Sequence, residues 1–153
     1  MNRLELSIDS YLGNVSLVAA AVSSVCIYLG LDGITANQVE LCTVEAVTNA
    51  IQHAYHGQPG HLVSVTVTSK PGELCLEIRD RGTPMPAEYI KRLLHGSDVF
   101  QIREIERESL AESGRGLQIM HDLMDAVAYS SEGGFNGLQL TKHLPCQGQV
   151  EVE

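Results

Sequence analysis

Two pairs of alternating apolar segments, each joined by a glycine turn, constrain the fold of this chain most. A hairpin turn at Lys70-Pro71-Gly72 joins the first pair, and Gly133-Gly134 lies in the turn of the second. One more alternating segment near the N-terminus places Leu4, Leu6 and Ile8 on one face. The expected strands span residues 3–8, 61–69, 73–80, 126–130 and 138–144. The pattern therefore predicts a sheet that the last two strands close.

Helical patterns fill the intervals between these strands. Asn14 can cap the first helix, and Gly30 lies near its end. Thr35 and Gln38 have the spacing of a capping box, which predicts that the second helix begins near Thr35. The expected helices span residues 14–29, 35–56, 87–94 and 117–124.

A single domain is expected for the whole chain, residues 1–153. Apolar residues make up 44% of the sequence and charged residues 19%, which is typical of a globular protein. The polar segment at about 95–113 has little to bury, which predicts a mobile lid with partial helix. Residues from about 145 to 153 are expected to fray.

Charge and cysteine content exclude several classes of protein. Ten basic and nineteen acidic residues give a formal charge of −9, which argues against a nucleic-acid binder. The N-terminus lacks the layout of a signal peptide, and the apolar stretch 15–31 is short for a membrane span and contains serines. No Cys-x-x-Cys pair is present. These features indicate a cytoplasmic protein with reduced thiols and no membrane segment.

The first candidate motif lies inside the second expected helix. Glu45 and Asn49 are four residues apart, so they share a helix face. A carboxylate beside an amide oxygen suits Mg²⁺ when phosphates supply the other ligands, and Glu45 could instead accept a proton. Taken alone, the pair is better explained by a solvated Glu and Asn on an exposed helix face.

The second motif, Asp80-Arg81-Gly82-Thr83-Pro84, follows an aliphatic strand. A carboxylate at a strand end can accept a hydrogen bond from an adenine amino group, and Gly82 lets the backbone approach the base. An ordinary Asp-x-Gly turn containing Pro84 is the alternative.

The third motif, Ser113-Gly114-Arg115-Gly116, is expected at the start of a helix. Free N–H groups at a helix N-terminus bind phosphate, and Arg115 adds a cation. A glycine helix start after a loop is the alternative. The three motifs together predict a nucleotide pocket, and because the chain has no Gly-x-x-x-x-Gly-Lys-Ser/Thr pattern, an ATP site must be built in another way.

Two histidines near the end of the second helix raise the question of a metal site. His53 and His56 are three residues apart and could meet on one helix face. No third ligand lies at a convincing spacing, so polar residues at an exposed helix end are the favoured interpretation.

These motifs resemble the N box and the two glycine boxes of the GHKL ATPase superfamily. Within it, the chain is most similar to the small stand-alone anti-sigma-factor serine kinases. The supporting segments are Glu45-Ala-Val-Thr-Asn-Ala-Ile-Gln-His53, Asp80-Arg-Gly-Thr-Pro-Met-Pro86, Gly116-Leu-Gln-Ile-Met-His-Asp-Leu-Met-Asp125 and Leu140-Thr-Lys-His-Leu144. The resemblance covers about Leu4 to Leu144.

The resemblance implies an α+β fold, a two-layer sandwich of the GHKL (Bergerat) type with a mixed, mainly antiparallel sheet and helices on one face. ATP with Mg²⁺ would lie between the helices and under the lid. By motif position, Asn49 would be the Mg²⁺ ligand, Glu45 the general base and Asp80 the adenine reader. The remaining implied nucleotide contacts are Gly82, Pro84, Gly114, Arg115 and Gly116.

The resemblance also implies protein partners. Family members bind a sigma factor, phosphorylate a serine of a STAS-type anti-anti-sigma protein and commonly act as homodimers. The apolar residues 19–22 and 26–28 could form such a contact, and a buried core helix explains them equally well.

Two positions depart from the family pattern. Glu112 stands where near relatives carry an arginine that can touch the γ-phosphate, and Leu138 follows Gly137 where many relatives carry threonine. A nucleotide-dependent binding module with little or no phosphotransfer is therefore the alternative function. A detached catalytic domain of a histidine kinase is a third, although no helix with a phosphoacceptor histidine precedes the domain.

Overall fold

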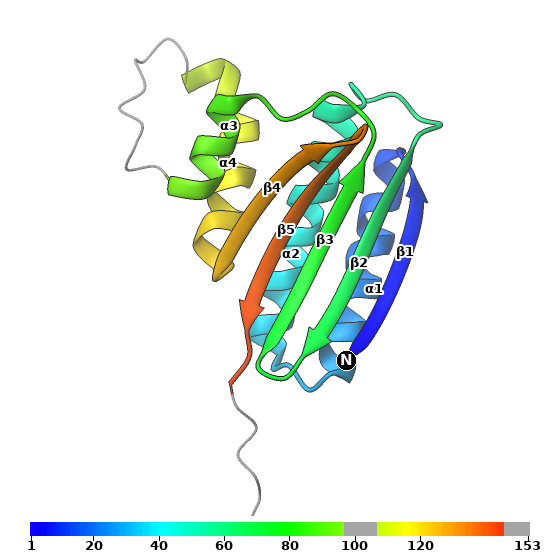
Figure 1. Cartoon of the computed structure of the whole chain (residues 1–153), viewed down its shortest axis with the longest axis vertical. Helices are drawn as coiled ribbons and strands as arrows, with labels where there is room; N and C mark the ends of the chain where they lie inside the picture. The colour runs from blue at the N-terminus through cyan, green and yellow to red at the C-terminus, as the bar shows by residue number, and fades with distance from the viewer. Residues whose placement is uncertain (97–106, 146–153) are drawn as a thin grey trace, which may run out of the picture.

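Five strands form one sheet in the order β1-β2-β3-β5-β4, and all four pairings are antiparallel. A computed structural model of the chain describes residues 1–96 and 107–145, and for 107–113 the backbone alone (Figure 1). The strands are β1 (Asn2–Asp9), β2 (Leu62–Lys70), β3 (Glu73–Asp80), β4 (Ala126–Glu132) and β5 (Phe135–His143). Both predicted hairpins are confirmed. The expectation of a mixed sheet is wrong, because the described residues contain no parallel pair.

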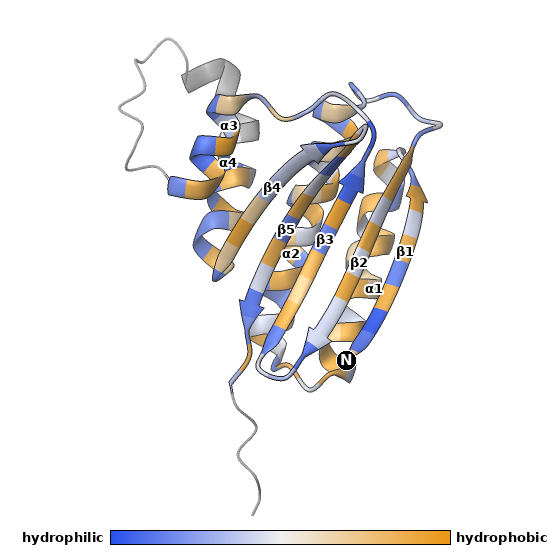
Figure 2. Ribbon diagram, viewed as in Figure 1, coloured by the Kyte–Doolittle hydropathy of each residue, from blue (hydrophilic) through white to orange (hydrophobic). Residues whose placement is uncertain are grey.

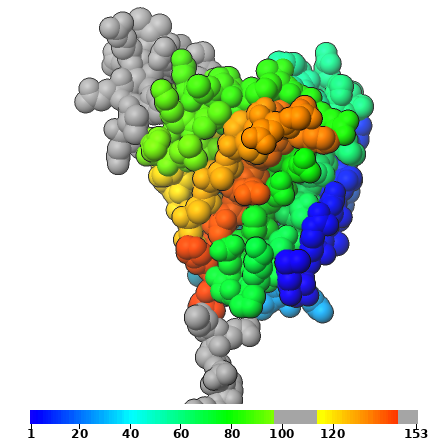
Figure 3. All heavy atoms as spheres, viewed as in Figure 1, coloured from blue at the N-terminus to red at the C-terminus, as the bar shows by residue number. Residues whose placement is uncertain are grey.

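The helices lie on one side of this sheet and leave its other face uncovered (Figures 1 and 3). They are α1 (Val15–Tyr28), α2 (Gly33–Asn49), α3 (Ala87–His95) and α4 (Arg107–Leu123), and a short 3-10 turn, η1 (Leu12–Asn14), precedes α1. Helices α1 and α2 pack on each other, α4 packs against α2, and α3 packs on α4. The α+β sandwich is thus confirmed.

The start of α2 and the capping of α1 differ from the predictions. Asp32, not Thr35, caps α2, since its carboxylate accepts hydrogen bonds from Thr35 N at 2.9 Å and from Thr35 Oγ1 at 2.7 Å. Asn14 precedes α1, but its side chain donates to the carbonyl of Asp9 at 3.2 Å instead of capping the helix.

Helix α2 continues without a break into a π-helical turn, η2 (Ala50–Ala54). The turn is closed by the Tyr55 N–H, which donates to the carbonyl of Ala50 at 3.1 Å. Such wide turns within helices are uncommon and occur often at functional sites. The sequence pattern predicted one regular helix here.

The core lies between the inner sheet face and the helices, where apolar residues gather (Figure 2). Helix α1 divides into two faces: Val18, Ala19, Val22 and Cys26 are buried, whereas Leu17, Ile27 and Tyr28 are exposed. The interpretation as a buried core helix therefore holds for residues 19, 22 and 26, whereas residues 27 and 28 lie on the exposed face and could contact a partner.

Two cysteines of the helices lie in the core, and no described helix could cross a membrane. Burial raises the pKa of Cys26 to about 11 and that of Cys42 to about 12, so both thiols stay protonated at neutral pH. Within residues 1–96 and 107–145, no helix has both the length and the apolar character needed to cross a membrane.

Candidate functional site

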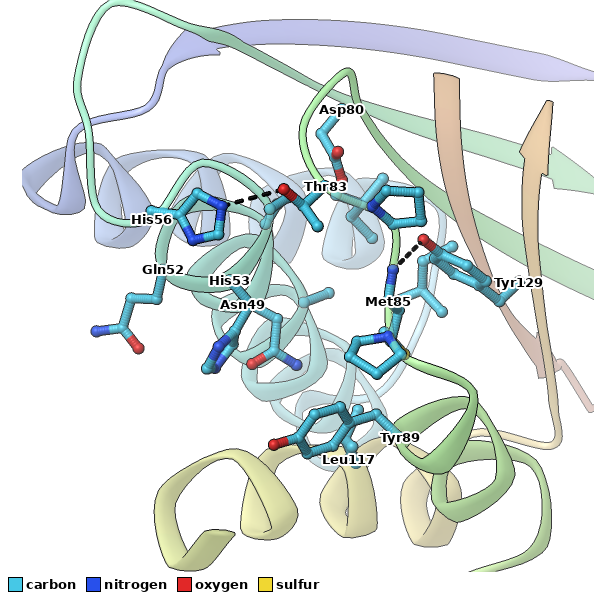
Figure 4. Close-up of a pocket in the computed structure, with 17 residues that line it drawn as sticks. Asn49, Gln52, His53, His56, Asp80, Thr83, Met85, Tyr89, Leu117 and Tyr129 are labelled. Carbon is cyan, nitrogen blue, oxygen red and sulfur yellow. Dashed lines mark hydrogen bonds between the residues drawn. The ribbon is translucent and has the colours of Figure 1, made fainter. Parts of the chain in front are cut away.

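A cavity of about 250 Å³ lies between the end of α2, the loop after β3, helices α3 and α4, and the inner face of β4 and β5 (Figure 4). Asp80 and Thr83 stand at one end of it, and Tyr89 and Leu117 at the other, with Asn49 between them. The other lining side chains with polar groups are Gln52, His53, His56 and Tyr129. The wall is otherwise apolar, which is the usual composition of a small-molecule site.

Asp80 is the most firmly oriented polar group of this cavity. Its Oδ1 accepts a hydrogen bond from Asn136 Nδ2 at 2.7 Å and another from the Gly82 N–H at 2.9 Å. Asn136 is 3% exposed and is itself fixed by Ser131 Oγ, which donates to its Oδ1 at 2.8 Å. Within the described chain, the Asp80 Oδ2 accepts no hydrogen bond, so this oxygen can serve a ligand donor.

The electrostatics of Asp80 follow from this position. Burial raises the pKa of the Asp80 carboxyl, and the hydrogen bonds from Asn136 and Gly82 partly oppose the shift by favouring the charged form. A raised pKa at an oriented carboxylate in a cavity is typical of a functional site.

Gly82 is required by close packing of two backbone segments. A Cβ built on Gly82 would collide with the backbone carbonyl of Ala54 and approach Ala54 Cβ to 2.8 Å. The neighbouring Thr83 N–H donates to the same Ala54 carbonyl at 2.9 Å. The loop that carries Asp80 is thus held against η2, and Gly82 itself faces a second, more open hollow.

Two tyrosines position this loop from opposite sides. The Tyr129 hydroxyl accepts a hydrogen bond from the Met85 N–H at 2.7 Å (Figure 4). The Tyr55 hydroxyl accepts one from the Arg81 N–H at 2.7 Å and donates to the carbonyl of Leu62 at 2.7 Å. Burial raises the pKa of both phenols, so both remain hydrogen-bond donors at neutral pH.

The first motif is split between the cavity and its rim. Asn49 lines the cavity, whereas Glu45, one turn earlier on α2, lies against Gly116 of α4, where a Cβ built on the glycine would approach the Glu45 Cδ to 3.3 Å. Both side chains are half-buried. Neither belongs to the solvated helix face that was the alternative.

The third motif lies elsewhere than predicted. Helix α4 begins at Arg107, so Ser113, Gly114, Arg115 and Gly116 are inside the helix and not at its N-terminus. The predicted position at a helix start is therefore wrong, and interior N–H groups are bonded to carbonyls of the preceding turn. The contact of Gly114, Arg115 and Gly116 with nucleotide stays a prediction. Of the predicted lid, residues 97–106 lie outside the described residues, and residues 107–113 form the beginning of α4. The fraying predicted near the C-terminus concerns residues 146–153, which also lie outside the described residues.

Of the predicted site residues, three line the cavity: Asn49, Asp80 and Pro84. The other five predicted site residues are not among the described residues that line the cavity: Glu45, Gly82, Gly114, Arg115 and Gly116. Sequence reasoning missed Asn136, Tyr129 and Tyr89. No local sequence motif identifies these three residues, because each is brought to the site by contacts between segments that are distant in the sequence.

The two histidines, His53 and His56, belong to the cavity wall. His53 stacks with Tyr89, their ring centroids 6.5 Å apart, and His56 Nε2 lies 3.0 Å from Thr83 Oγ1. Among residues that the structure describes, no group of three His, Cys, Asp or Glu side chains could hold a metal ion. The prediction that both side chains are exposed is confirmed. Their position in the wall of a cavity was not predicted.

A protein-family model described as the histidine kinase-like ATPase domain matches residues 8–142. The same fold is found in the crystal structure of the SiaB–SiaC complex from Pseudomonas aeruginosa, where one chain superposes with a TM-score of 0.57 at 13% sequence identity. That superposition covers 89% of this chain and 88% of the other. The fold, the cavity and the family match together define an ATPase domain, a class that binds ATP.

Curated relatives narrow this class. The chain is 31% identical over 154 residues to the anti-sigma F factor of Geobacillus stearothermophilus, covering 97% of each chain. It is also 31% identical over 134 residues to the anti-sigma F factor of Halalkalibacterium halodurans, covering 86% of this chain and 84% of that relative. The chain therefore belongs to the histidine kinase-like ATPase family, in the group that contains the anti-sigma F factors.

Proposed function

We propose that the protein is an ATP-dependent serine kinase that captures a sigma factor and phosphorylates a STAS-type anti-anti-sigma protein. The observation that carries the proposal is the Asp80 carboxylate, fixed through Oδ1 and offering Oδ2 to the cavity of an ATPase-type fold. The anti-sigma F factor relatives support the choice of partners. Sigma factors act in transcription, so the proposed place of action is the cytoplasm.

Adenine binds at the Asp80 end of the cavity. Its amino group donates to Asp80 Oδ2, while the apolar wall formed by Ile78, Met85 and Leu138 packs against the ring. Because Gly82 has no Cβ, the loop lies close to η2 and keeps Asp80 at this depth.

Asn49 and Glu45 have a donor set that suits Mg²⁺. Both offer side-chain oxygens from one face of α2, and Mg²⁺ takes one or two protein oxygens when phosphates and water complete its shell. Asn49 is the proposed ligand, since it lies on the cavity wall. Bound Mg²⁺ would neutralise phosphate charge during transfer.

Transfer of the γ-phosphoryl group needs a proton acceptor for the attacking serine. The serine oxygen forms a bond to the γ-phosphorus, the bond to the bridging oxygen of the β-phosphate breaks, ADP leaves, and Glu45 takes the hydroxyl proton. Glu45 suits this role because its carboxylate is half-buried one helical turn from Asn49.

The exposed face of α1 supports a protein contact, including the proposed homodimer. Leu17 is 68% exposed and Tyr28 is 88% exposed, and no charged residue lies between Val15 and Tyr28. Uncharged apolar surface of this kind marks interaction sites.

The proposal is tested by incubating the purified chain with Mg²⁺, γ-labelled ATP and each anti-anti-sigma protein of its source genome. We expect phosphoserine on one of them by mass spectrometry. Glu45→Gln should keep ATP affinity and lose transfer, whereas Glu40→Gln, on the same helix, should keep both.

Three outcomes would contradict the proposal in distinct ways. Failure to bind ATP would overturn the nucleotide site. ATP binding without phosphoserine on any partner would favour the binding module that Glu112 suggests, whose side chain lies outside the described residues. Undiminished transfer by Glu45→Gln would remove Glu45 from the role of base.

A further inference from the structure

Three helices meet one turn beyond the end of the cavity that lies opposite Asp80. Asn49 of α2, Tyr89 of α3 and Leu117 of α4 line the cavity (Figure 4). Each has a neighbour three or four residues along the chain on the same helix face. These neighbours are Glu45, Arg92 and Gly114. A ligand whose base lies at Asp80 would therefore direct its phosphates toward this junction.

Arg92 occupies the space that Gly114 leaves open. A Cβ built on Gly114 would lie 2.7 Å from Arg92 Nη1. The Arg92 side chain is half-buried, and its helix packs on α4. Two residues further along, on a different side of α4, Gly116 leaves room for the Glu45 carboxylate. The two glycines thus admit a guanidinium from α3 and a carboxylate from α2.

The backbone of α4 cannot supply the positive potential that phosphate requires here. Helix α4 begins at Arg107, seven residues before Gly114, which corresponds to about 10 Å along the helix axis. The N–H groups at Gly114 and Gly116 are therefore in the helix interior. Phosphate charge at the junction must be met by a side chain or a metal ion.

Other cations with described side chains point elsewhere. Arg115 and Lys91 are exposed to solvent. Arg79 and Arg81 both lie over the ring of Phe135, at 4.5 Å and 4.2 Å from its centroid, and Lys142 Nζ donates to the carbonyl of Leu123 at 2.6 Å. Neither these residues nor Arg92 line the cavity itself, but Arg92 is the cation that lies beside Gly114, one turn beyond the cavity lining at Tyr89 and Leu117.

The geometry points to Arg92 as the residue that binds the terminal phosphates of ATP. The assignment rests on the proposed kinase function and adds a residue that the motifs do not contain. Its guanidinium donates two hydrogen bonds to non-bridging oxygens of the γ-phosphate, a geometry that suits the planar fork of arginine. During transfer it stabilises the charge that develops as the bond to the ADP oxygen breaks.

The test compares nucleotides that differ only in their phosphates. Calorimetric titrations with ATP and AMP, each with Mg²⁺, are made on the wild-type chain, Arg92→Gln, Arg92→Lys and the control Lys91→Gln. We expect Arg92→Gln to bind ATP at least about tenfold more weakly and AMP within about twofold of wild type. Arg92→Lys should lose less ATP affinity, and Lys91→Gln should match wild type for both nucleotides.

The phosphotransfer rate gives a second readout. Arg92→Gln should slow transfer to the partner serine by a factor of about 10² to 10³ at saturating ATP. ATP affinity and transfer equal to those of Lys91→Gln would overturn the assignment. Equal loss of ATP and AMP affinity would also overturn it, because that pattern indicates a structural role.

Gly114→Ala tests the same contact from the other helix. The added methyl group displaces the guanidinium while alanine favours the helix, so the variant stays folded. We expect it to lose ATP affinity selectively, as Arg92→Gln does. Unchanged ATP affinity would contradict the proposal. A wild-type chain that binds neither nucleotide would instead refute the proposed function, so the two failures are distinguishable.

Discussion

The two glycine segments of the site show two different reasons for glycine. In the segment after β3, Gly82 allows the loop backbone to lie directly against the backbone carbonyl of Ala54. In the second, Gly114 and Gly116 lie inside a regular helix, and side chains from two other helices fill the space above them. The first contact is rigid because neither partner can rotate away. The second is adjustable because Arg92 and Glu45 are flexible.

This difference separates stability from function. A glycine against backbone is needed for the fold itself, whereas a glycine against a side chain lowers helix stability and gains room for a functional group. Substitutions in the two segments should therefore have unequal and partly opposite effects.

The largest effect is expected for Gly82→Ala. The new Cβ collides with the Ala54 carbonyl, which already accepts the Thr83 N–H, so the loop must move away from η2. We expect a loss of about 3 kcal/mol in the free energy of unfolding. Urea denaturation measures it, with Gly33→Ala as control, because nothing lies within 4 Å of that position. Equal stability of the two variants would contradict the packing argument.

Asp80→Asn should come next and should act on binding alone. The asparagine oxygen can still accept from Asn136 and Gly82, but adenine loses a charged acceptor. We expect ATP affinity to fall by about 10- to 100-fold. The melting temperature should not fall, because burial disfavours the charge that is removed. Asp122→Asn, at an exposed position on α4, is the matched control; an equal fall in its ATP affinity would contradict the assignment.

The third effect is a pH dependence. Since the pKa of Asp80 is raised in the folded chain, the folded protein holds this proton more tightly than the unfolded chain does. Ionising Asp80 therefore costs stability as pH rises, while adenine binding requires the ionised form. Adenosine affinity should fall as pH decreases through the raised pKa, by at most about tenfold per pH unit. Asp80→Asn should abolish this slope, and a slope that persists would assign it to another group.

The smallest effect is expected within α4. Gly114→Ala should raise the free energy of unfolding by about 0.5–1 kcal/mol, since only the flexible end of Arg92 must move. Gly116→Ala should gain less, because the added Cβ would lie 3.3 Å from the Glu45 Cδ, closer than an ordinary contact. Thermal denaturation of the pair without nucleotide measures the difference. A larger gain for Gly116→Ala would reverse the proposed order of crowding.

Local patterns predicted what local forces decide. Alternation gave the strands, and the Asp80-x-Gly82 turn was placed correctly because a strand end and a tight turn are both local. The anchoring of Asp80 by Asn136 could not be seen, since β5 meets β3 only through the sheet register. The start of α4 was missed because two glycines in a polar stretch favour a helix boundary, and contacts with α2 and α3 override that preference.

The π-helical turn η2 has a consequence for insertions and deletions in this chain. It holds one residue more than an α-helical turn would, so removal of one codon within Ala50–Ala54 would restore a regular helix and rotate everything after it by about 100°. Tyr55 would then leave both Leu62 and Arg81, the two backbone groups that its hydroxyl joins. The length of this short turn therefore fixes the position of Tyr55, and through the Arg81 N–H it fixes the loop that carries Asp80.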